Sequence, residues 1–175
     1  MPIFGASKRP GLEGLTKEEE RRRDSLNPEV VRRAGEKGMA GQTVAAVTVL
    51  RERTEAEPGE PLWPLILGRQ LMSMRRFAQA IEAFTAAVER DASDVRASFG
   101  AGAAYFEAAE AKQSRGSAAT DDVAPPGLTV DNLYNEALRH LRRALELTDD
   151  AGERGQLRSA IGAVEKALAR KAGRL

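Results

Sequence analysis

Apolar residues recur along most of the chain at steps of three and four positions, which is the period of an amphipathic α-helix. Glycine, proline and capping residues interrupt this pattern at short intervals and predict where each helix begins and ends. The expected helices cover residues 27–38, 43–55, 62–74, 77–90, 94–113, 129–147 and 153–172. The sequence therefore predicts an all-α protein of seven antiparallel helices, joined mostly by short turns.

Residues 1–26, here called the arm, differ from the rest because glycine, proline and charged residues dominate them. Thr16 and Glu19 match the capping-box pattern, so residues 17–24 are expected to form a short exposed helix. A solvated spacer and a docking helix are both compatible with this charged run. Ile3 and Phe4 are bulky apolar side chains near the terminus, and we expect them to be the residues through which the arm docks onto a partner.

Residues of the same type recur at a step of 34 positions, which is the length of one helix-turn-helix unit. Gly68 and Gly102 are separated by this step. If an insertion of 23 residues is allowed around a loop at 114–128, Leu141 takes the register of Phe84. The period therefore predicts stacked helical hairpins, in which small residues allow close approach and large ones fill the gaps.

At these positions the chain resembles the tetratricopeptide repeat (TPR) family, whose unit is a 34-residue helical hairpin. The clearest match is the unit 61–94, with the family's Leu-Gly pair at 67–68, its aromatic residue at Phe77, and its small-large-small set at Ala80, Phe84 and Ala87. The resemblance implies an α-α superhelix of three antiparallel hairpins and a C-terminal capping helix. Its divisions are the arm at 1–26, repeats at 27–60, 61–94 and 95–151, the last with a loop insertion near 114–128, and a cap at 152–175. An ordinary helical bundle with coincidental spacing is the alternative.

Stacked hairpins create a concave face that is lined by the first helix of each pair, and in the TPR family this face binds peptides. Mapped onto this chain, the predicted peptide-binding groove contains Val31, Gly35, Leu62, Leu65, Arg69, Met72, Phe99, Ala103 and Phe106. The row is mostly apolar and Arg69 is its only cation, which favours an apolar or amphipathic partner segment. A clamp for carboxylate ends is not expected, because its Lys and Asn donors are missing. The alternative is that Leu65, Phe99 and Phe106 are core residues, covered by the arm or by the insertion.

The composition limits the chemistry that the chain can carry. Among its 175 residues are no Cys and one His, and 27 basic residues are balanced by 26 acidic ones. Without Cys there are no disulfides, thiolate metal sites or cysteine nucleophiles. The net charge of +1 creates no global field that would attract nucleic acid. No apolar run is long enough to span a bilayer or to act as a signal sequence, so a cytoplasmic location is expected.

Candidate catalytic and cofactor sites are weak. The segment Gly-Ala-Gly-Ala-Ala-Tyr at 100–105 begins like a dinucleotide fingerprint, but it lacks the third glycine and no strand precedes it. His140 has no second ligand at metal spacing and is expected at the surface or at a hairpin interface. The carboxylate pairs at 121–122 and 149–150 fit loops and helix ends. We therefore expect no enzyme activity, no cofactor, no metal and no small-molecule substrate.

The sequence as a whole favours a non-catalytic scaffold or adaptor that docks a segment of another protein. A permanent subunit of a larger assembly, held through the arm and the insertion as well as the groove, is also possible. A third reading follows from the tail, because residues 151–175 contain six basic side chains and only two acidic ones. Such a helix could contact RNA or an anionic membrane surface, although aromatic residues for base stacking are missing there.

Overall fold

The fold of the chain is described by a computed structural model over residues 11–12, 14–35, 38–115 and 123–173. Its helices are α1 (Lys17–Asp24), α2 (Asn27–Ala34), α3 (Gly38–Ala56), α4 (Leu62–Ser73), α5 (Phe77–Arg90), α6 (Val95–Arg115), α7 (Val130–Leu147) and α8 (Ala151–Ala172). No strand occurs in these described ranges. The expected all-α class is confirmed.

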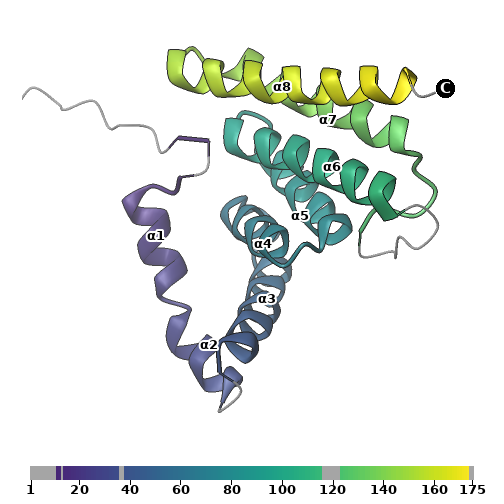
Figure 1. The fold of residues 1–175 in the computed structure, drawn as a ribbon. Helices are drawn as coiled ribbons and strands as arrows, with labels where there is room; N and C mark the ends of the chain where they lie inside the picture. Colours follow the sequence, from purple (N-terminus) through teal and green to yellow (C-terminus); the bar gives the residue numbers. More distant parts are fainter. Residues whose placement is uncertain (1–10, 13, 36–37, 116–122, 174–175) are drawn as a thin grey trace, which may run out of the picture.

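The helices stack in chain order, and each of them packs against the next from α2 to α8. In addition, α4 contacts α6, and α6 contacts α8, so alternate helices form a second line of contacts. This pattern of neighbour contacts is that of an α-α superhelix, in which one hairpin lies on the previous one. In Figure 1, α1 and α2 lie to the side of α3 and α4, while α8 covers the opposite end of the stack.

Phe84 holds the second hairpin against the first helix of the third. Its side chain on α5 is 2% exposed. A Cβ atom added at Gly68 on α4 would lie 2.9 Å from the Phe84 ring, and one at Gly100 on α6 would lie 2.4 Å from it. Both distances are below ordinary van der Waals contact, so the ring fits only because both helices have no side chain there.

The third hairpin repeats this arrangement with a different large residue. A Cβ atom at Gly102 on α6 would lie 2.7 Å from the Leu141 side chain on α7. Leu141 is 1% exposed. Gly102 therefore meets Leu141 within its hairpin as Gly68 meets Phe84 within the preceding one. This equivalence is the one that the 34-residue step and the allowance for an insertion predict.

Local capping signals place most helix ends where the sequence predicts them. The Thr16 hydroxyl accepts a hydrogen bond from the Glu19 N–H, and the Glu19 carboxylate accepts one from the Thr16 N–H, which completes the expected capping box. Thr129 makes the same reciprocal arrangement at the start of α7. The carboxylates of Asp94 and Asp150 accept backbone N–H bonds at the starts of α6 and α8.

The first hairpin turns earlier than the sequence suggests. The expected break at Gly38 and Gly41 is wrong, because both glycines lie within α3. Instead α2 ends at Ala34, and Gly35 follows with φ of 55°, a conformation that glycine adopts without steric cost. The positive φ, which the sequence alone does not reveal, decides which of several glycines makes the turn.

The insertion between α6 and α7 returns to the body of the protein at its C-terminal end. Val123 and Ala124 are 3% and 5% exposed, so they belong to the core. Lys112 Nζ donates a 2.6 Å hydrogen bond to the Leu128 carbonyl and joins the end of α6 to the loop. The segment 116–122 lies outside the described residues.

His140, which is expected either at the surface or at a hairpin interface, lies at a hairpin interface. It is 4% exposed and its ring stacks on Tyr105 of α6, with the ring centroids 5.5 Å apart. Burial, reinforced by the neighbouring Arg139 guanidinium, lowers the pKa of His140 to about 4. The imidazole is therefore neutral at pH 7 and packs as an aromatic side chain.

The glycine packing predicts opposite effects for two substitutions that are chemically identical. Gly100→Ala should lower the free energy of unfolding by about 1–3 kcal/mol, because its Cβ would overlap the buried Phe84 ring. Gly162→Ala on α8 should raise it by about 0.5–1 kcal/mol, because nothing lies within 4 Å and alanine favours the helix. Urea unfolding followed by circular dichroism measures both. Equal effects at the two positions would contradict the packing argument.

His140 also predicts how stability depends on pH. The unfolded chain binds a proton at His140 near pH 6.5, but the folded chain does so only near pH 4. Its contribution, about 3 kcal/mol, is therefore present above pH 6.5 and is lost as the pH falls toward 4. His140→Phe should flatten the decline in unfolding free energy between these pH values. A decline of unchanged slope in that variant would assign it to other groups.

Candidate functional site

A segment of the arm lies across the face formed by the first helices of the second and third hairpins. Among its described residues 11–12 and 14–16, the Gly14 N–H donates a hydrogen bond to the Gly11 carbonyl over 2.8 Å. Leu12 is only 2% exposed and belongs to the hydrophobic core. The arm therefore buries an apolar residue other than the expected docking residues Ile3 and Phe4.

Two cavities flank the Leu12 side chain. The first has a volume of about 300 Å³ and is lined by Leu12, Arg69, Met72, Phe84, Arg96, Phe99, Gly100 and Ala103. The second, of about 360 Å³, is lined by Gly11, Leu12, Gly14, Phe99, Gln156 and Ala160. Leu12 and Phe99 line both cavities, so the arm occupies this face without filling it.

Two arginines hold the arm segment from the body side. Arg69 on α4 donates from Nη2 to the carbonyl oxygens of Leu12, at 3.5 Å, and Gly14, at 3.3 Å. These are long bonds and therefore weak ones. Arg96, near the start of α6, also donates from Nη1 to the Gly14 carbonyl at 3.4 Å. The backbone carbonyls of the arm thus accept hydrogen bonds from two arginines, one on the second hairpin and one on the third.

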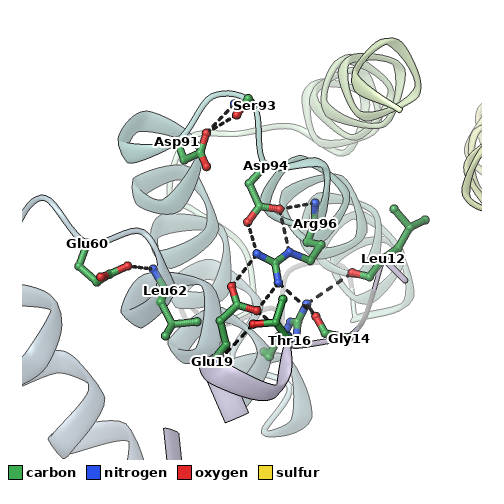
Figure 2. Close-up of polar contacts among 11 residues, drawn as sticks. Leu12, Gly14, Thr16, Glu19, Glu60, Leu62, Asp91, Ser93, Asp94 and Arg96 are labelled. Atoms are coloured by element: carbon green, nitrogen blue, oxygen red, sulfur yellow. Dashed lines mark hydrogen bonds and ion pairs between the residues drawn. The ribbon is translucent and has the colours of Figure 1, made fainter. Parts of the chain in front are cut away.

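Arg96 makes the strongest contact with the arm. Its Nη1 and Nη2 atoms donate to the two carboxylate oxygens of Glu19 at 2.7 and 2.9 Å. Its Nε and Nη2 atoms donate to the Asp94 carboxylate at 3.0 and 2.7 Å. Figure 2 shows the guanidinium between the two acids, with Leu12, Gly14 and Thr16 beside it. Planar, two-pronged pairing of this kind is strong because both charge and geometry match.

The same contact sets the protonation of Glu19. Burial alone would raise the pKa of its carboxyl group, but hydrogen bonds from Arg96 and Thr16 and the charge of Arg96 outweigh it and lower the pKa to about 2. The neighbouring acids raise the pKa of Arg96, which stays charged at all relevant pH values. The ion pair is therefore intact at neutral pH.

The other end of α1 contacts the turn between α3 and α4. The Arg22 guanidinium lies over the Trp63 ring, 4.9 Å from its centroid, and pairs with Glu60 at 2.8 Å. Leu26, directly after α1, is 7% exposed and joins the core. Glu19 and Arg22 thus dock α1 on the body of its own chain, while its other side chains are exposed. Docking of the arm on a partner stays a prediction. The docking residues Ile3 and Phe4 lie outside the described residues.

The predicted groove residues separate into four groups. Arg69, Met72, Phe99 and Ala103 come together around the first cavity. Leu62 and Leu65 are 3% and 1% exposed and belong to the core, which is the alternative considered for Leu65. Phe106 is partly buried and packs near Tyr134, with the ring centroids 6.1 Å apart. Val31 and Gly35 are exposed on the first hairpin and do not line this cavity.

Two residues at this face, Leu12 and Arg96, do not belong to the predicted groove, and Arg69 is not its only cation. Arg96 lies one helical turn before Phe99 on α6, so the spacing of the face could have indicated it. Leu12 lies 57 residues before Arg69 in the sequence, and no periodic signal connects the two. Its only local sign is that it is a leucine between glycines in a polar segment.

Other candidate chemistry is limited within the described ranges. These residues contain no group of three or more His, Cys, Asp or Glu side chains placed to hold a metal ion. None of the helices described there combines the length and apolarity that crossing a membrane requires. On α8, Arg154 donates to the carbonyls of Leu145 and Thr148, and Lys171 pairs with Asp131, so part of the basic tail serves the fold.

Comparison with known proteins agrees with this architecture. No protein-family model and no curated protein matches the chain, but a search of solved structures finds similar folds. One of them is the first TPR domain of Spaghetti (RPAP3), solved with the HSP90 peptide SRMEEVD. It has a TM-score of 0.53 at 19% sequence identity, and the match covers 85% of this chain and 94% of that one. The chain therefore has a TPR-like fold.

The ion pair at Glu19 predicts an acid-sensitive contact. Glu19→Gln should lower the free energy of unfolding by about 1 kcal/mol at pH 7, because it removes a charged pair. The folded-state pKa of Glu19 lies below the ordinary value of 4.5, so the wild-type advantage is present above pH 4.5 and shrinks as the pH falls toward 2. Urea unfolding of both proteins at several pH values measures the difference. A difference that stays constant from pH 5 to pH 3 would contradict this assignment.

Proposed function

We propose that the chain is a protein-interaction scaffold whose concave face, between α4 and α6, binds an extended or amphipathic segment of another protein. The single observation that supports this most strongly is the occupation of that face by residues 11–19 of the chain itself. A backbone turn, the buried Leu12 side chain and the Glu19 carboxylate are all accommodated there. A surface that holds these groups from its own arm has the chemistry to hold them from a partner.

The cavity residues give the proposed site its selectivity. Met72, Phe99 and Ala103 supply apolar surface, and methionine adapts to ligands of different shape. Arg69 donates toward backbone carbonyls, which every peptide offers, whereas Arg96 pairs with a carboxylate, which only some offer. We infer that apolar contact supplies most of the affinity and that Arg96 selects acidic segments.

The structural neighbour is compatible with this proposal. Its bound peptide, SRMEEVD, combines a methionine with acidic residues. In this chain, Leu65 occupies one of the positions where a carboxylate clamp would need a polar donor, and it is buried. The proposed cation for an acidic group is therefore Arg96 rather than a clamp of Lys and Asn. Docking alone accounts for these features, and the proposal includes no catalytic step.

A library of displayed peptides selected on the full-length protein tests this function. Peptides that bind should lose at least tenfold in affinity, measured by fluorescence polarisation, when Met72→Glu places a charge in the cavity that Phe99 and Ala103 also line. Val44→Glu on α3 is the matched control, because Val44 is 59% exposed and lies on the first hairpin. Circular dichroism shows whether each variant remains folded.

Three outcomes would contradict the proposed site. The library yields no peptide that binds above background, the selected peptides bind the Met72→Glu variant as well as wild type, or they depend on Val44 instead. The last result would move the docking surface to the exposed end at α2 and α3. That end has its own open cavity of about 520 Å³, lined by Arg33, Ala40, Gly41, Val44, Ala45 and Thr48.

A further inference from the structure

The arm contacts the concave face as a ligand contacts a binding site. Leu12 inserts between two cavities, the backbone carbonyls of residues 12 and 14 face Arg69, and the Glu19 carboxylate faces Arg96. The contacts are complementary in charge and in polarity, and they come from two hairpins that the arm thereby joins. Figure 2 shows Leu12, Gly14, Thr16 and Glu19 of the arm around Arg96.

The occupation has features of a contact that can be exchanged. The two cavities beside Leu12, of about 300 and 360 Å³, leave room for a larger side chain. The Arg69 bonds are 3.3 and 3.5 Å long and contribute little. In addition, α1 has only eight residues, and a helix of that length has marginal stability without tertiary contacts. The arm is held mainly by Leu12, Glu19 and Arg22, with Leu26 anchoring its far end.

We propose that the described arm residues 11–12 and 14–19 are an internal ligand of the concave face, which an acidic partner segment with one leucine-sized or larger apolar side chain displaces. This inference rests on the proposed function and adds to it the kind of partner and the regulation of the site. The partner presents its apolar side chain to the Phe99 cavities and its carboxylate to Arg96. Because it can fill space that Leu12 leaves empty, it gains apolar contact that the arm lacks.

The arm competes with a partner segment despite its modest contacts, because it is covalently attached to the protein whose face it occupies. A segment on the same chain has an effective concentration in the millimolar range, so it occupies the face without high intrinsic affinity. If the arm is bound in about 90–99% of molecules, the apparent Kd of any partner is raised about 10- to 100-fold. Releasing the arm should therefore strengthen partner binding by a similar factor.

The decisive experiment uses a fluorescein-labelled synthetic peptide with the sequence of residues 11–24 and measures its binding to full-length proteins by fluorescence polarisation. The double variant Leu12→Ser/Glu19→Gln, whose own arm is released, should bind this peptide at least tenfold more tightly than wild type. Glu20→Gln is the control, because Glu20 is an exposed neighbour on α1, and it should bind like wild type. An unlabelled peptide that carries the Leu12→Ser/Glu19→Gln changes should fail to compete.

The single tryptophan provides a second measurement that needs no variant. Trp63 is 4% exposed beneath the Arg22 guanidinium, so release of α1 should expose the indole and shift its emission to longer wavelength. Saturating wild-type protein with an unlabelled peptide of residues 11–19, which carries Leu12 and Glu19 but lacks Arg22, should therefore produce this shift. If the double variant does not fold, Glu19→Gln alone replaces it, with an expected gain of at least threefold.

Several results would overturn the internal-ligand inference. Affinity within twofold for wild type and the released variant, or equal competition by the altered peptide, would show that the arm does not occupy the binding site. A concentration-dependent dimer of wild type in light scattering, abolished by Leu12→Ser, would assign the face to the arm of a second copy. Library peptides that require Met72 but leave Trp63 emission unchanged would refute this inference while keeping the proposed function.

Discussion

The stack depends on one steric constraint, namely that the Phe84 ring must fit between two helices that come too close to admit any Cβ atom. Gly68 and Gly100 provide the space, one from the same hairpin and one from the next. Since interiors are packed as densely as organic crystals, this fit determines how near α4 and α6 approach and how one hairpin rotates on the other. That rotation produces the concave face, and Phe84 and Gly100 also line its first cavity, so the geometry of the candidate site depends directly on this contact.

Much of the fold can be predicted from the sequence because its determinants are local or periodic. The capping residues Thr16, Thr129 and Asp150 lie within a few positions of the N–H groups that they bind. The register of glycines and large residues repeats because each hairpin faces the same packing problem. The first turn is harder to place, since three glycines compete for it and only backbone geometry selects Gly35.

The candidate site is less predictable, because its determining contacts are not periodic. Glu19 and Arg96 are separated by 77 residues, and nothing near either residue indicates the other. A run of mixed charges also has the same composition whether it faces water or a guanidinium. Leu65 shows the converse case, a residue that the sequence places in the groove but that the structure buries. Its position on the first helix of a hairpin suits a groove, but α4 is buried on most of its surface, so the side chain lies in the core. Helical periodicity indicates which residues share a face but not which element covers that face.

The contacts that hold both ends of the insertion between α6 and α7 have a practical consequence. Lys112 joins α6 to the Leu128 carbonyl, and Val123 and Ala124 are anchored in the core, so α7 is fixed in place by residues on both sides of the intervening segment. We expect an affinity module or an optical sensor inserted between positions 115 and 123 to leave the curvature of the scaffold unchanged, because lengthening a connection costs little when both of its ends are held.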